Sequence, residues 1–243
     1  MSTLSGSEVG AGPAGRVVAL RCFPVKAAGG ESLAALEVTP SGVAGDREWA
    51  VYDQADKLAS GKHTRRLRRM DEVFALVASR RGGDTVLVLP DGTEVVAGES
   101  GADTALSTHF REPVRLRRED AIPHQDAAPV SVVGTATLAE LGRHEGDGRP
   151  LDPRHLRTNI VVETQEPYVE ESWVGHEVSI GGVRLRVTDR TERCRMVGVA
   201  QVDLPPRPGM LKVVSVHHDL RAGVYAEVVA PGRIALGDEA GLA

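Results

Sequence analysis

Two cysteines supply the only thiols of this 243-residue chain, and one of them has charged neighbours. The segment TERCRMVGV (191–199) places Cys194 between Arg193 and Arg195. Nearby positive charge stabilises a thiolate, which is the form that ligates soft metals and attacks electrophiles. In a regular strand, however, both arginines would point to the face opposite Cys194. The segment therefore indicates either a metal-binding or reactive thiol, or a half-buried thiol flanked by two solvated arginines.

The second cysteine has an apolar setting. In RVVALRCF (16–23), the side chains of Val18, Leu20 and Cys22 would share one face of a strand. A free cysteine in such a row behaves as a small hydrophobic residue. We expect Cys22 to be a core residue.

Isolated cations stand beside predicted strands and turns, namely Lys26, Arg47, Arg157 and Arg193. Each by itself is typical of a solvated side chain or a local salt bridge. Brought together, they would form a pocket for a multiply charged anion such as a phosphate, because guanidinium groups bind such oxygens with two parallel hydrogen bonds. Composition does not establish that they converge.

The common catalytic and metal motifs are missing from the sequence. It contains no H-x-x-x-H, H-E-x-x-H or C-x-x-C and no P-loop. A Ser-His-Asp triad stays open, although no G-x-S-x-G elbow supports one.

Composition narrows the partners and the compartment. Lys and Arg total 29 and Asp and Glu total 34, so the net charge is −5 and we expect neither a nucleic-acid nor a membrane partner. The Ser/Gly-rich residues 1–15 show no basic or apolar signal region, which predicts a disordered tail and a cytoplasmic protein.

Short alternating segments must position these side chains. Strands are expected over 15–23, 47–53, 58–60, 74–80, 84–98 with a Pro-Asp-Gly turn, 112–118, 129–133, 159–163, 176–189 with a Gly-Gly turn, and 223–238. Thr137 and Glu140 match a capping box that would begin a helix, whereas residues 208–220 fit a helix or a strand.

The fold class that follows is mostly β (α+β). Residues 119–129 are acidic and spaced by prolines, which indicates a connection between two β-rich halves. We predict an N-terminal β-barrel-like segment over 16–120 and a second β-barrel with a few short helices over 121–243.

Six motifs in this order resemble one known family. They are FPVKA (23–27), GVAGDREWAVYD (42–53), LRTNIVV (156–162), PYVEESW (167–173), ERC (192–194) and GVYAEVVAPGRIALGD (223–238). Together they resemble the MOSC proteins, which are named for the C-terminal domain of molybdenum cofactor sulfurase. The form they resemble has an N-terminal β-barrel domain and is similar to the amidoxime-reducing-component type. The resemblance covers about residues 16–240.

This resemblance implies a site for a molybdenum cofactor (a molybdenum-pyranopterin). Cys194 would be the catalytic residue and the molybdenum ligand, a soft donor suited to a sulfur-rich site. The residues implied to hold the pterin and its phosphate are Lys26, Arg47, Thr137, Arg157, Asn159, Arg193 and Tyr225. For Thr137 the capping interpretation competes evenly, and Asp46, Trp49, Glu171 and Trp173 match architectural positions.

The sequence also departs from the family pattern. Ala27 stands where serine is common, Thr158 stands where proline is common, and Glu192 is unusual beside an anionic cofactor. The stretch ASGKHTRRL (59–67) matches loosely, so that either Lys62 or Arg65 would replace a family arginine.

The implied activity is reduction of small N-hydroxylated or N-oxide substrates. Two cysteines are too few for an iron-sulfur cluster. An external electron donor, of the ferredoxin or flavodoxin type with its reductase, is therefore expected. Two other hypotheses stay open: a sulfur carrier with a Cys194 persulfide, and a cofactor-binding or cofactor-free protein without a redox role. The resemblance further implies pyridoxal phosphate binding, as a family property assigned to no residue.

Overall fold

Strands dominate the computed structural model, which describes residues 13–121, 123–146 and 148–243. The described residues also form three α-helices and four short 3-10 helices. The mostly β fold class is confirmed. Of the predicted tail, residues 1–12 lie outside the described residues, and residues 13–15 instead begin the first strand.

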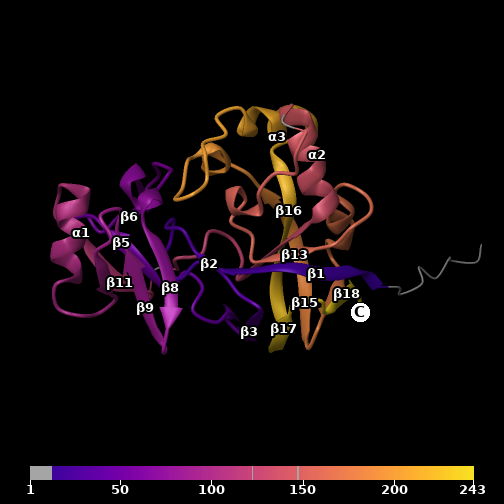
Figure 1. The fold of residues 1–243 in the computed structure, drawn as a ribbon. Helices are drawn as coiled ribbons and strands as arrows, with labels where there is room; N and C mark the ends of the chain where they lie inside the picture. Colours follow the sequence, from indigo (N-terminus) through magenta and orange to yellow (C-terminus); the bar gives the residue numbers. More distant parts are fainter. Residues whose placement is uncertain (1–12, 122, 147) are drawn as a thin grey trace, which may run out of the picture.

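Seven strands close into a barrel in the C-terminal half of the molecule, drawn in pink to yellow in Figure 1, with one indigo strand among them. In order around the barrel they are β13 (Ile160–Val162), β12 (Val130–Gly134), β16 (Arg221–Ala230), β15 (Val183–Glu192), β14 (Glu177–Ile180), β18 (Glu239–Leu242) and β1 (Pro13–Cys22), which pairs back with β13. Alternate apolar side chains such as Val132, Leu185 and Val224 fill the interior.

The indigo strand is β1, so the N-terminal segment contributes a strand to the C-terminal barrel. Cys22 at its end is 1% exposed, which confirms the predicted core position. A smaller sheet also joins the two halves, because β17 (Gly232–Ala235) pairs with β3 (Ala35–Thr39), which pairs with β4 (Gly42–Val43). The sequence boundary near residue 120 therefore does not separate the sheets.

The rest of the N-terminal half contains two sheets with one apolar core. One has the order β11 (Arg115–Arg118), β5 (Trp49–Tyr52), β6 (Leu58–Ser60) and β7 (Leu67–Arg69); the other has β10 (Glu94–Val96), β9 (Asp84–Val88) and β8 (Val77–Arg81). The short β2 (Glu31–Ser32) pairs antiparallel with the end of β1. Leu76, Leu87 and Leu106 are fully buried between these sheets and α1 (Ala102–Phe110).

Two helices, α2 (Thr135–Glu145) and α3 (Met210–His218), pack together at one end of the barrel (Figure 1). Segment 208–220 is thus largely helical. The predicted capping box is wrong, because α2 begins two residues before Thr137, with extended Gly134 as its N-cap. The backbone N–H of Ala136 binds Thr164 Oγ1 instead.

The 3-10 helices are η1 (Asp71–Ala75), η2 (Pro153–His155), η3 (Val169–Trp173) and η4 (Arg195–Gly198). The described part of the chain has no helix that is both long and apolar enough to cross a bilayer.

Candidate functional site

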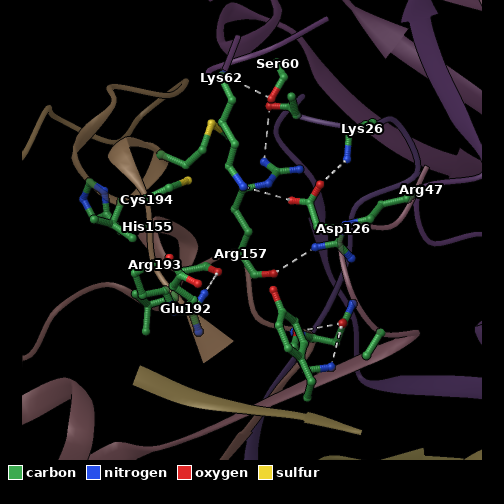
Figure 2. A pocket seen from close by; sticks show the side chains of 18 residues that line it. Lys26, Arg47, Ser60, Lys62, Asp126, His155, Arg157, Glu192, Arg193 and Cys194 are labelled. Carbon is green, nitrogen blue, oxygen red and sulfur yellow. Dashed lines mark hydrogen bonds and ion pairs between the residues drawn. The ribbon is translucent and has the colours of Figure 1, made fainter. Parts of the chain in front are cut away.

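A polar pocket lies where the two halves meet, and both contribute to its wall (Figure 2). Cys194 and His155 stand on one side of it, and Lys26, Arg47 and Asp126 stand on the other. The strand ends and loops around the barrel rim supply these side chains, whereas the barrel interior is filled by apolar residues. The pocket is therefore a surface site held by a rigid scaffold.

Cys194 occupies the turn between β15 and η4, where its backbone is extended and its side chain is partly exposed. Lys62 lines the pocket together with Cys194, and its ammonium lies 3.9 Å from Asp126 Oδ2 (Figure 2). Burial opposes the charge of Lys62, but the Asp126 carboxylate and the Cys194 sulfur outweigh it and raise the pKa of Lys62. The cation at the thiol is thus Lys62.

The flanking arginines turn away from the thiol. Arg193 donates from Nε and Nη2 to Ala222 O and from Nη1 to Leu156 O, over distances of 2.6–2.9 Å. Arg195 binds Gly61 O and Asp71. Both therefore fix the backbone around Cys194, although Arg193 also lines the pocket.

On the opposite wall, Lys26 is 5% exposed and donates to Asp126 Oδ1 at 2.8 Å and to His124 O at 2.5 Å. Burial lowers the pKa of Lys26 to about 8, with the Asp126 carboxylate acting against that shift. Desolvation in the pocket would raise the pKa of the Asp126 carboxyl, but the ammonium groups of Lys26 and Lys62 have the larger effect and hold that pKa well below its usual range. Asp126 is the central anion among these cations.

Arg157 carries a buried donor without an acceptor. Its Nη1 donates to Ala28 O at 2.7 Å and to Ala27 O at 3.3 Å, and its guanidinium lies 4.4 Å from the Phe23 ring centroid. Its Nη2 is buried and finds no hydrogen-bond partner among the described residues. Burial, together with nearby Arg47, lowers the pKa of Arg157 to about 9. An anionic or carbonyl oxygen in the pocket would supply the missing partner.

Arg47 is the third cation of this wall. It forms an ion pair with Asp46, and its Nη2 donates to Arg157 O at 3.2 Å. Asp46 also accepts a hydrogen bond from Phe23 N, in keeping with an architectural position. The backbone is left-handed at Ala27, Arg47 and Arg157, with φ of 66°, 54° and 53°. Non-glycine residues adopt this region at a cost of about 1–3 kcal/mol, and such strain gathers at functional sites.

Asn159 and Tyr225 also line the pocket. The Asn159 side-chain oxygen accepts hydrogen bonds from the N and Oγ of Ser131, at 3.2 and 2.9 Å, and its Nδ2 donates to Arg21 O. Asn159 therefore links β12, β13 and β1 below the pocket, and its role toward a ligand stays a prediction.

Of the residues singled out from the sequence, the structure brings seven to the pocket: Lys26, Arg47, Arg157, Asn159, Arg193, Cys194 and Tyr225. Thr137 lies elsewhere. Its hydroxyl donates to Glu170 Oε1 and accepts from Tyr168 N, so it anchors η3 to α2. Glu170 is fully buried there, whereas neighbouring Glu171 binds His218.

Sequence reasoning missed Asp126, which it placed in a connecting segment, and left Lys62 and Arg65 as alternatives. The structure puts Lys62 in the pocket and leaves Arg65 exposed. It also missed His155, which is 1% exposed and whose ring nitrogens have no hydrogen-bond partner in the described chain. Burial lowers the pKa of His155 to about 4, so the ring is neutral. Its position two residues before Arg157 was the available signal.

Two family models match the chain. Residues 14–105 match the model described as the MOSC N-terminal beta barrel domain, and residues 119–240 match the model of the MOSC domain. A search of curated proteins gave no significant match.

Two solved structures are similar to this chain. The YuaD protein from Bacillus subtilis is 16% identical over 96% of this chain and 94% of its own, with a TM-score of 0.50. YiiM from Escherichia coli is 10% identical over 94% of this chain and 69% of its own, with a TM-score of 0.45. The likeness to YuaD supports the fold alone.

Proposed function

The chain belongs to the MOSC domain family, and on that premise we propose that its pocket binds a molybdenum cofactor and reduces N-hydroxylated or N-oxide compounds. One observation carries the proposal. A partly exposed thiol, an ammonium beside it and a buried guanidinium with an unused N–H share a single pocket. This donor set suits a soft metal at one end and a phosphate at the other.

The residues fit such a ligand in a definite order. Cys194 would hold the molybdenum through its sulfur. Arg157 offers its unpaired Nη2, and Lys26 offers an ammonium that Asp126 already orients, so these two would hold the phosphate. Arg47 keeps the Arg157 backbone in place. Arg193 and Tyr225 complete the wall, while Thr137 lies too deep in the η3–α2 contact to be included.

Bound there, the cofactor would supply the two-electron chemistry that removes oxygen from the substrate. The chain itself orients the ligand and sets the local charge. Lys62 supplies a positive charge to the wall that it shares with Cys194. His155 stays neutral in the wall next to Cys194 and adds no charge there.

Metal content tests the proposal. The chain is produced in a host that makes the cofactor, and molybdenum per chain is measured by elemental analysis for wild type, Cys194→Ser and Cys22→Ser. We expect near-stoichiometric metal in the wild type and in Cys22→Ser, and loss in Cys194→Ser, because a hydroxyl is a poor ligand for a soft site. Equal occupancy in all three would sink the ligand assignment. Cyanide-labile sulfur on Cys194 without molybdenum would favour the persulfide carrier.

The partners and the compartment follow from the same proposal. Electrons would come from a ferredoxin- or flavodoxin-type donor with its reductase, and the substrate would be a small molecule. We propose a cytoplasmic location, because a reducing compartment keeps both thiols free.

A further inference from the structure

The residue after Cys194 fastens the cysteine segment to the N-terminal half. Arg195 Nη1 donates to Gly61 O at 2.8 Å. The same guanidinium binds Asp71 at the start of η1 with two parallel contacts, at 2.9 and 3.1 Å. A bidentate pair of this kind fixes orientation as well as distance. Arg195, Gly61 and Asp71 form what we call the clasp.

Close packing surrounds the carbonyl that the clasp binds. A Cβ built on Gly61 would lie 2.4 Å from Met196 Sδ, 3.0 Å from Phe74 Cζ and 3.2 Å from Arg195 Nη1. A side chain at position 61 would therefore have to displace the ends of the Met196 and Arg195 side chains, so glycine lets both pack against this backbone.

The clasp closes a ring around the pocket wall. Gly61 and Lys62 are consecutive residues, and so are Cys194 and Arg195. The Cys194 side chain acts electrostatically on the Lys62 ammonium, and the Arg195 guanidinium donates to the Gly61 carbonyl, so the two pairs are connected at both ends. Two members of this ring, Lys62 and Cys194, line the pocket. The Lys62 side chain is 34% exposed, so its ammonium is placed by the backbone at Gly61 and by the Asp126 carboxylate more than by burial.

We propose that Arg195 is a positioning residue, which, with Asp71, holds Gly61 so that the Lys62 ammonium stays beside Cys194. This rests on the proposed function only in taking Cys194 as the working thiol. If the clasp only linked the two halves, its loss would destabilise the fold but would not change the positive electrostatic field that surrounds the Cys194 sulfur.

The electrostatic field around the Cys194 sulfur can be measured by comparing the rates at which two reagents alkylate the thiol. The rate with anionic iodoacetate is divided by the rate with neutral iodoacetamide, on full-length chain from a host that lacks the cofactor, at one pH. The ratio cancels the accessibility and the reactivity of the thiol, and leaves the attraction of the local field for the anion. Peptide mass spectrometry assigns the label to Cys194, since Cys22 is buried.

The central variant is charge-balanced. Arg195→Gln with Asp71→Asn leaves the net charge unchanged, and its combination with Lys62→Met separates displacement of Lys62 from the direct field of the two lost groups. We expect Lys62→Met to lower the ratio by about three- to tenfold and the balanced pair to lower it by a similar factor. All three substitutions together should lower it no further, because groups that act through one another are non-additive.

A matched control comes from the same half of the chain. Arg81 and Glu94 form an exposed pair through contacts of 2.8 and 2.9 Å. Arg81→Gln with Glu94→Gln should leave the ratio unchanged. If the Arg195→Gln, Asp71→Asn protein fails to fold, Arg195→Gln alone is combined with Lys62→Met. The proposal then predicts that the two substitutions together lower the ratio less than the product of their separate effects.

An unchanged ratio in the balanced pair, or effects that multiply with Lys62→Met, would overturn the positioning role. A wild-type chain without molybdenum but with the expected ratios would instead contradict the proposed function and leave the clasp standing.

Discussion

Lys26 and Asp126 form an ion pair of 2.8 Å across the pocket, although they lie 100 positions apart in the chain. Lys26 enters from the bridge after β1, and Asp126 from the connection between the halves. The pair therefore joins the two halves directly at the candidate site.

Removing the carboxylate should destabilise the fold in a pH-dependent way. In Asp126→Asn, the buried Lys26 ammonium loses its counter-charge, and we expect a loss of about 1–3 kcal/mol near pH 6.5. The pKa of Lys26 is lowered to about 8, so the ion pair loses its positive charge as the pH rises above about 8. The pKa of Asp126 is lowered from 3.8, so the stabilisation by its carboxylate fades as the pH falls below 3.8. The difference between variant and wild type should be largest between these limits.

Urea denaturation at pH 6.5 and pH 9.5 measures that difference. Glu239→Gln serves as the control, because its partner Arg16 is exposed and such a pair contributes less than about 1 kcal/mol. A difference that grows between pH 6.5 and pH 9.5 would contradict the assignment of the pair.

The strand pattern of this protein could be read from local sequence, whereas its closure could not. Alternating runs predicted most strands and both hairpins, since period-two patterning is a local property. The pairing of β1 with β13 joins segments about 140 residues apart in the chain, and nothing in either segment specifies its partner. Helix α1 was missed, although its buried residues Ala102, Leu106 and Phe110 recur every four positions, as they do on one face of a helix.

In the candidate site, too, the sequence predicted individual residues but not how they come together. Motif order identified the cations and Cys194, but the convergence of Lys62 and Asp126 depends on tertiary packing. Arg193 seemed a ligand for an anion, yet its donors are used by the Ala222 and Leu156 carbonyls. Thr137 matched a capping pattern, but Glu170 takes its hydroxyl. Local chemistry identified candidates, and the fold determined which groups stay available.

The two thiols should differ sharply in reactivity. Cys22 is 1% exposed, and burial together with Asp46 raises the pKa of its thiol, whereas Cys194 is partly exposed. Native protein should react rapidly with one equivalent of Ellman's reagent and unfolded protein with two. Cys22→Ser should cost about 1–2 kcal/mol of stability and spare molybdenum content, because a hydroxyl is poorly placed in this apolar row. Two rapidly reacting thiols in the native chain would reverse that view.

Arg157 should matter through both its charge and its planar fork. Arg157→Ala removes the unpaired Nη2 donor and the cation above Phe23, while Arg157→Lys keeps only the charge. Reconstitution with isolated molybdenum cofactor should give the tightest binding for wild type, weaker binding for Lys and the weakest for Ala. We expect about tenfold between the first and the last, for one charge-assisted hydrogen bond. Arg80→Ala, at an exposed position in β8, is the control. Equal affinities in the three proteins would place Arg157 outside the ligand contacts.

Electron supply gives the last prediction, and it follows from the cysteine count. An iron-sulfur cluster needs about four protein ligands, normally cysteines, and this chain has two, one of which is buried in the barrel. Its G-x-G-x-x-G string, GAGPAG (10–15), leads into the first predicted strand instead of following a strand and opening a helix, so it does not match a dinucleotide fingerprint. The purified, molybdenum-loaded protein should therefore reduce an N-hydroxylated test compound with a reduced viologen, but not with NADH or NADPH alone. Adding a ferredoxin or flavodoxin with its reductase should restore nicotinamide-driven turnover, and Cys194→Ser should abolish turnover with every donor. Robust NADH-driven activity of the isolated chain would contradict the need for a partner, whereas inactivity with the viologen in loaded protein would favour the carrier hypothesis.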